Sequence, residues 1–122
     1  MIKLDDIRYL AKDLYGLFPK EVKLVQQTYE LTYSAGEYSE LLTLQNPIFV
    51  TNVQVGSVIA SLDSDIYISA SANNDNDPKS FVVKDGVLNC VGGIWKYIKV
   101  SGSAESDTTI QITIVGYELK YN

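Results

Sequence analysis

The fold of this chain is decided by two runs in its last third, which read Gly92-Gly93-Ile94-Trp95-Lys96-Tyr97-Ile98-Lys99-Val100-Ser101-Gly102-Ser103 and Thr108-Thr109-Ile110-Gln111-Ile112-Thr113-Ile114-Val115-Gly116-Tyr117. In the second run, Ile110, Ile112 and Ile114 share one face, while Gln111 and Thr113 share the other. A period of two with β-branched and aromatic residues is typical of half-buried antiparallel strands. We therefore predict that the two runs pair with each other in a β-sandwich or barrel.

Shorter alternating segments between residues 23 and 91 predict further strands. We expect them at 25–33, 41–44, 48–55, 58–62, 66–70, 81–83 and 87–91. The dipeptide Asn46-Pro47 is expected to end one strand, and Asp85-Gly86 to turn a hairpin. Short strands at this spacing, about eight in all, favour an antiparallel sandwich. The spacing leaves the immunoglobulin-like and jelly-roll strand orders both open.

A helical pattern precedes these strands and covers residues 4–18. Its apolar residues recur at spacings of three and four and so share one face; they are Leu4, Ile7, Leu10, Leu14, Leu17 and Phe18. Two heptads are too short for an independent coiled coil, so the helix must dock on its own β-domain, on a symmetry mate or on another protein. We predict that residues 1–18 anchor or oligomerise the chain through these six residues, and that residues 23–122 form the sandwich.

Composition limits the classes of function. The net charge is −5, and the 10 Lys and Arg residues are spread along the chain, which argues against nucleic acid as a partner. No apolar run approaches the roughly 20 residues of a membrane span, and no signal peptide is visible, so we expect no membrane partner. A single cysteine, Cys90, excludes an intramolecular disulfide and is expected to be an inert thiol.

Catalytic chemistry has little support in the sequence. The chain contains no histidine, which removes the commonest general base and the commonest metal ligand. The acidic pairs Asp63/Asp65 and Asp75/Asp77 could offer oxygen ligands to Ca²⁺, but they lack EF-hand spacing and are typical of turns. No two glutamates are marked as convergent for glycoside hydrolysis. We predict no enzymatic activity, no metal and no cofactor.

Two aromatic residues, Trp95 and Tyr97, alternate along one strand and are expected to share a face. Ile94, Ile98 and Val100 form an aliphatic face, which we expect to be the core. Trp95 and Tyr97 would then lie at an interface or stack on a sugar ring, although paired aromatics also fill sandwich cores. This pair supports an alternative function, that of a carbohydrate-binding or adhesion module with a surface glycan as partner.

The segment from residue 92 to residue 117 resembles the closing hairpin of small β-domains in tailed-phage virion proteins. In those domains a W-x-Y-I-x-V strand, a Gly/Ser/Asp turn and an alternating Thr/Ile strand that ends in Gly recur, and Trp95 to Val100 followed by Thr108 to Gly116 match this pattern. The resemblance implies a non-enzymatic structural protein of the virion, such as a head-fibre, decoration or tail-associated component. It also implies a homo-oligomer, with a trimer favoured, that contacts other virion proteins and assembles in the host cytoplasm.

Overall fold

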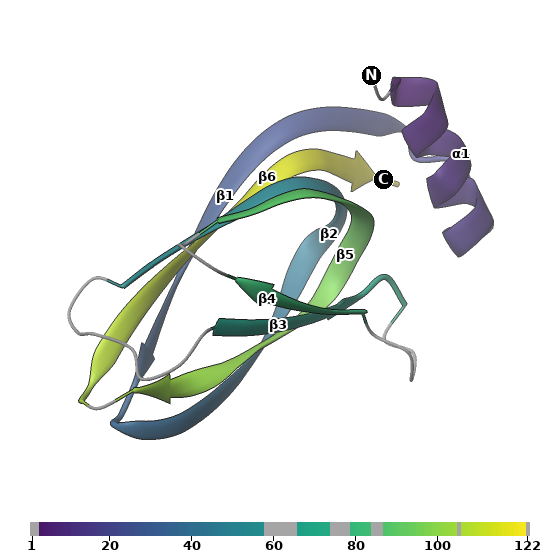
Figure 1. Ribbon diagram of the computed structural model, residues 1–122. Helices are drawn as coiled ribbons and strands as arrows, with labels where there is room; N and C mark the ends of the chain where they lie inside the picture. The colour runs from purple at the N-terminus through teal and green to yellow at the C-terminus, as the bar shows by residue number, and fades with distance from the viewer. Residues whose placement is uncertain (1–2, 58–65, 74–78, 84–86, 105, 122) are drawn as a thin grey trace.

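The computed structural model describes residues 3–57, 66–73, 79–83, 87–104 and 106–121 (Figure 1). Within these residues one helix precedes six strands; the sequence predicted this order of helix and strands, but about eight strands. The elements are α1 (Leu4–Tyr15), β1 (Glu21–Tyr33), β2 (Gly36–Ser57), β3 (Ile66–Ser71), β4 (Lys79–Val83), β5 (Val87–Ala104) and β6 (Thr108–Lys120). The strand expected at 58–62, the acidic pairs Asp63/Asp65 and Asp75/Asp77, and the Asp85-Gly86 turn lie outside the described residues.

All strands belong to one antiparallel sheet in the order β1-β6-β2-β5-β3-β4. The two longest strands, β2 and β5, connect its two halves. The first part of β2 pairs with the second part of β5, whereas the second part of β2 lies between β6 and the first part of β5. Figure 1 shows β2 and β5 curving together at one end of the molecule, so that the sheet folds over on itself. The result is the sandwich-like, mainly β architecture that the alternating pattern predicted.

The pairing of the two runs that decide the fold differs from the prediction. β5 and β6 are not neighbours, because β2 lies between them. β6 uses one edge to pair with β1 from Glu21 to Tyr33 and the other to pair with β2 from Ile48 to Ser57. Alternation identifies which face of a strand is buried but says nothing about which strand lies beside it, so the faces of β6 were predictable and its partners were not.

Two predicted strand ends are also wrong. β2 continues through Asn46-Pro47, and its register with β5 shifts between Thr43 and Ile48. Proline lacks an N–H donor, and such an irregularity in the ladder is where a strand tolerates it. Likewise, the segment at 87–91 is the beginning of β5, and β4 pairs with β3 instead. These mergers account for part of the difference between the roughly eight strands expected and the six that the described residues form.

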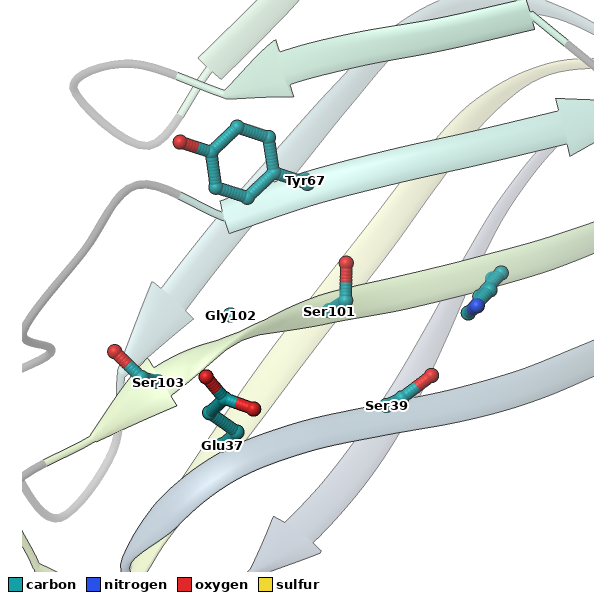
Figure 2. Close-up of a pocket in the computed structure, with 7 residues that line it drawn as sticks. Glu37, Ser39, Tyr67, Ser101, Gly102 and Ser103 are labelled. Atoms are coloured by element: carbon teal, nitrogen blue, oxygen red, sulfur yellow. The ribbon is translucent and has the colours of Figure 1, made fainter.

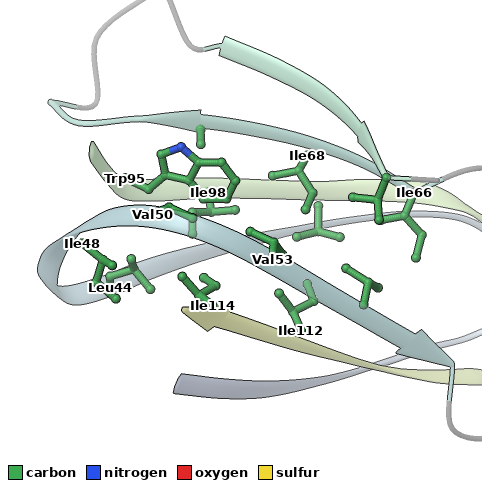
Figure 3. Packing of buried hydrophobic residues seen from close by; sticks show 14 of the residues in the cluster. Leu44, Ile48, Val50, Val53, Ile66, Ile68, Trp95, Ile98, Ile112 and Ile114 are labelled. Carbon is green, nitrogen blue, oxygen red and sulfur yellow. The ribbon is translucent and has the colours of Figure 1, made fainter. Parts of the chain in front are cut away.

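The core lies between the two halves of the folded sheet (Figure 3). Strands β2 to β6 each contribute buried side chains, and β1 adds the partly buried Val25, Tyr29 and Leu31, which pack against them. Ile110, Ile112 and Ile114 of β6 face inward as predicted. The buried members are Leu44, Ile48, Val50, Val53, Val55, Ile66, Ile68, Ala70, Val83, Trp95, Ile98, Val100, Ile110, Ile112 and Ile114.

Val83, the last residue of β4, closes the core at that edge of the sheet. Every strand thus places at least one side chain in the core or against it. Burial of these aliphatic groups is the main source of stability in a domain of this kind.

A bulge at Thr51 keeps the inner face of β2 continuous. Val50 pairs with Gly116 and Asn52 pairs with Val115, so Thr51 is the extra residue, and its hydroxyl donates to the Val115 carbonyl at 3.0 Å. The backbones approach closely here: a Cβ atom on Gly116 would collide with the carbonyl of Phe49 and would lie 2.9 Å from Cγ2 of Ile48. Glycine is therefore required at position 116.

Helix α1 packs on the outer face of the sheet. Ile7 and Ala11 are buried against Phe49 of β2, Ile94 of β5 and Leu119 of β6. The helix ends at Tyr15 rather than at residue 18, because Gly16 adopts the left-handed region (φ 80°) and its N–H donates to the carbonyl of Lys12, so Leu17 and Phe18 follow the helix. The helix thus docks on its own β-domain, one of the three partners that its apolar face allowed.

Across the described ranges, no helix is long and apolar enough to cross a membrane.

We predict that Gly116→Ala destabilises the fold by about 1–3 kcal/mol or more, because the new methyl group overlaps backbone that cannot move without breaking the β2–β6 ladder. Gly56→Ala is the matched control, since nothing lies within 4 Å of the site that a Cβ would occupy there. That variant should stay within about 0.5 kcal/mol of the wild type. Urea unfolding measures both variants, and equal stabilities would contradict the close approach.

Candidate functional site

Trp95 is a core residue, so the predicted aromatic platform is wrong. Its side chain is 3% exposed, and its ring lies 5.4 Å from that of Phe81, centroid to centroid. Tyr97 is only half-buried. The physical reason is the bend that β5 makes together with β2. Ile98 and Trp95 are successive buried residues of β5 but lie three positions apart, because the register with β2 shifts between them, so a strict period of two fails there. Ile94, expected in the same core as Ile98, packs under the helix instead.

We predict that Trp95→Ala costs about 3–5 kcal/mol of unfolding free energy, as expected for removing a large aromatic side chain from a packed core. Tyr9→Ala is the control, since Tyr9 is 62% exposed and should lose less than about 1 kcal/mol. Chemical denaturation followed by circular dichroism separates the two. A Trp95→Ala protein as stable as the Tyr9→Ala protein would contradict the burial of Trp95 in the core.

A polar groove of about 580 Å³ lies on the outer face of β2, β3 and β5. Figure 2 shows Tyr67 of β3 beside Ser101 of β5, with Ser39 and Glu37 on β2. The strand register produces this arrangement, because Ser39 pairs with Ser101 and Ser101 pairs with Tyr67 in one row across the sheet. The lining residues are Glu37, Ser39, Tyr67, Lys99, Ser101, Gly102 and Ser103.

The groove follows from alternation in the same strands that build the core. Ile68, Ile98 and Val100 point inward, so their neighbours Tyr67 and Lys99 point outward. This surface was not predicted from the sequence, because its lining residues come from three strands whose order the alternating pattern does not give. The signal that could have found it is the set of serines on the polar sides of β2, β3 and β5, which meet only once the strand order is known.

The groove also carries unused hydrogen-bonding capacity. In the part of the chain that the structure describes, the side chains of Ser39, Ser101 and Tyr67 form no hydrogen bonds, and the charged groups of Glu37 and Lys99 form no ion pair. Tyr67 is 48% exposed, and Val82 of β4, its partner in the ladder, is 40% exposed. An aromatic ring with polar groups on one side and an apolar neighbour on the other is available to a ligand.

A second pocket of about 360 Å³ lies between the end of α1 and the bend; it is lined by Tyr15, Leu17, Gln45, Asn46, Pro47, Lys96 and Tyr121. The Tyr15 hydroxyl donates to the Ala72 carbonyl at 2.8 Å, and its ring meets that of Tyr121 edge-on at 5.7 Å. Burial raises the pKa of the Tyr15 phenol above its ordinary 10.0, and the neighbouring Tyr121 and Tyr97 raise this pKa further. These contacts join the helix to both halves of the sheet.

We predict that Tyr15→Phe lowers the unfolding free energy at neutral pH by about 0.5–1.5 kcal/mol, since the bond to Ala72 is lost. Above pH 10 the unfolded wild type releases the Tyr15 proton while the folded protein retains it, so the raised pKa makes wild-type stability fall as pH rises. Phenylalanine cannot titrate, so the deficit of the variant should shrink between pH 9 and 11 in urea titrations. A deficit that stays constant over this range would contradict the raised pKa.

The six apolar residues predicted for the helix divide into two groups. Ile7 is 1% exposed and Leu10 is partly buried against the sheet, so Ile7 is wrong as an interface residue because it belongs to the core of its own chain. The other four extend past the sheet; they are Leu4 (48% exposed), Leu14 (39%), Leu17 (51%) and Phe18 (44%). The ring of Phe18 is covered on one side by Tyr9, at 5.5 Å between centroids.

One carboxylate, that of Glu118, is buried at the inner edge of β6. Gln27 Nε2 donates to Glu118 Oε2 at 3.1 Å, and the Tyr29 hydroxyl donates to Gln27 Oε1 at 2.6 Å. Burial, followed by the charge of Glu118, raises the pKa of the Tyr29 phenol. Lys120 Nζ lies 3.8 Å from Glu118 Oε1, so the buried carboxylate has an amide donor and a cationic neighbour, in line with the rule that buried polar groups find partners. Among the described residues, no group of three His, Cys, Asp or Glu residues could hold a metal ion.

Comparisons with known proteins give little further guidance. No protein-family model matches the chain, and no curated protein matches it. Among solved structures, a chain from Bacillus endospore appendages, described as a novel family of disulfide-linked pili, is similar with a TM-score of 0.43 and 14% sequence identity. The match covers 84% of this chain and 94% of that chain.

Proposed function

We propose that the chain is a non-enzymatic structural subunit that assembles with copies of itself through the exposed end of α1. The observation that carries this proposal is the set of exposed large apolar side chains on α1 and just after its end, namely Tyr9, Leu14, Leu17 and Phe18. Single exposed leucines are ordinary on protein surfaces. Four large apolar groups within residues 9–18 favour a surface that is covered in an assembly.

The occupant that we favour is a second copy of the chain. The helix end presents Lys12 over the Phe18 ring at 4.8 Å, and Asp13 is also exposed, so the patch has an apolar centre with charges of both signs around it. A symmetric contact between copies can pair such charges while it buries the apolar centre. The groove side chains lie on the opposite half of the sheet, so assembly through α1 leaves them uncovered.

The finer part of the proposal is that the subunit belongs to a tailed-phage virion, as a head-fibre, decoration or tail-associated component that assembles in the host cytoplasm with other virion proteins. The support is the sequence resemblance of residues 92–117. A trimer is the oligomer that fibre-like virion proteins would favour. The alternative of a carbohydrate-binding module on Trp95 and Tyr97 is not retained, because Trp95 is buried.

We predict an oligomer, with a trimer favoured, in sedimentation experiments at about 50 μM, since association is concentration-dependent. The double variant Leu17→Lys/Phe18→Lys should sediment as a monomer with a nearly unchanged unfolding midpoint, because both side chains are exposed within the subunit. Leu41→Lys is the matched control, because Leu41 is 75% exposed but lies on the other half of the sheet, and it should leave the oligomer intact. A monomeric wild type would overturn the proposal.

A further inference from the structure

We propose that the groove on β2, β3 and β5 binds a neutral pyranose unit of a glycan, with Tyr67 as the stacking residue. The groove is distinct from the helix surface used in the proposed assembly, so the glycan proposal does not depend on that assembly. Its volume of about 580 Å³ lies within the range of small-molecule sites, which is roughly 300–1,000 Å³. Its open form on a sheet surface suits one unit of a longer chain that lies across the strands.

Tyr67 supplies the apolar part of the recognition. The ring is 48% exposed, and Val82 lies opposite it in the β3–β4 ladder. The face of an aromatic ring is electron-rich, and it attracts the weakly positive C–H groups on one face of a pyranose. Because Tyr67 is held on a strand and paired on both sides, little conformational freedom is lost when a ligand stacks on it.

The other lining residues supply the polar part. Ser39 and Ser101 lie in the same row as Tyr67, and each hydroxyl can both donate and accept hydrogen bonds, as sugar hydroxyls do. Glu37 and Lys99 add one acceptor group and one donor group at the same groove. Figure 2 shows Ser101 of β5 between Tyr67 of β3 and the side chains of Glu37 and Ser39 on β2.

Charge selects the class of sugar. The groove holds one carboxylate, that of Glu37, and one ammonium, that of Lys99, so the two formal charges cancel. A sulfated or phosphorylated glycan would gain from Lys99 but would be repelled by Glu37 and by the net charge of −5. A neutral sugar can use both groups as hydrogen-bonding partners without either penalty. The lining therefore favours neutral hexose or N-acetylhexosamine units.

The test uses the full chain, labelled with ¹⁵N, and four probes: cellotetraose, maltotetraose, chitotetraose and a sulfated heparin tetrasaccharide. We expect at least one neutral tetrasaccharide to shift the amide resonances of residues 37–41, 67–71 and 99–103 at millimolar concentration. Tyr67→Ala should weaken that binding about 5- to 150-fold, by analogy with stacking of bases on aromatic rings. Tyr67→Phe keeps the ring and should retain most of the affinity.

Two further variants keep the result interpretable. Leu24→Ala removes an exposed apolar side chain from β1, at the opposite end of the strand order from β3 and β4, and should bind as the wild type does. Ser101→Val fills the groove beside Tyr67 with a residue that strands favour, so it should abolish binding even if Tyr67→Ala proves unstable. No shift at about 10 mM of any neutral probe, binding of the sulfated probe alone, or full binding by folded Tyr67→Ala would each overturn the proposal.

Discussion

The structure depends on the joint bend of β2 and β5, because this bend turns one sheet into two packed halves. The bend is possible where the β2–β5 register shifts between Thr43 and Ile48, with Pro47 buried inside it. A second irregularity, the bulge at Thr51 opposite Gly116, keeps the aliphatic side of β2 directed into the core beyond the bend. Without these two features, β2 would alternate its apolar residues between the core and solvent.

The same bend separates two outer faces with different chemistry. One half of the sheet receives α1, whose Ile7 and Ala11 cover Phe49, Ile94 and Leu119. The other half carries the polar groove at Tyr67, Ser101 and Ser39. A subunit built in this way can join an assembly through the helix side and still present the groove to solvent, so the two proposed roles are compatible in one molecule.

Much of the architecture could be predicted from the sequence, and the failures have physical causes. The alternation of Ile110, Ile112 and Ile114 identified the buried face of β6, because burial is a local property of the pattern. The helical spacing over residues 4–18 predicted α1, but of its six apolar residues only Ile7 and Leu10 pack on the sheet, and the helix ends at Tyr15. The partners of β6 were not predictable, since pairing depends on long-range contacts. The predicted exposure of Trp95 was wrong for a related reason. The period of two breaks at the bend of β5, and the position of this bend depends on the pairing of β5 with β2.

The groove could not be predicted from the sequence either. Ser39, Tyr67 and Ser101 lie far apart in the sequence, and each is an ordinary polar-face residue of its own strand. Only the strand order β2-β5-β3 and its register bring them into one row. A functional surface of this kind is a property of topology, so a reading of motifs along the chain cannot detect it.

The central claim is that subunits meet through the end of α1, and hydrogen exchange tests it most directly. Exchange is compared between the assembled wild type and the dispersed Leu17→Lys/Phe18→Lys protein. The account predicts slower exchange in the assembled form for amides of residues 9–20, with equal exchange in the groove segments 36–43, 66–71 and 97–104. Slower exchange in the groove segments, with residues 9–20 unchanged, would contradict it.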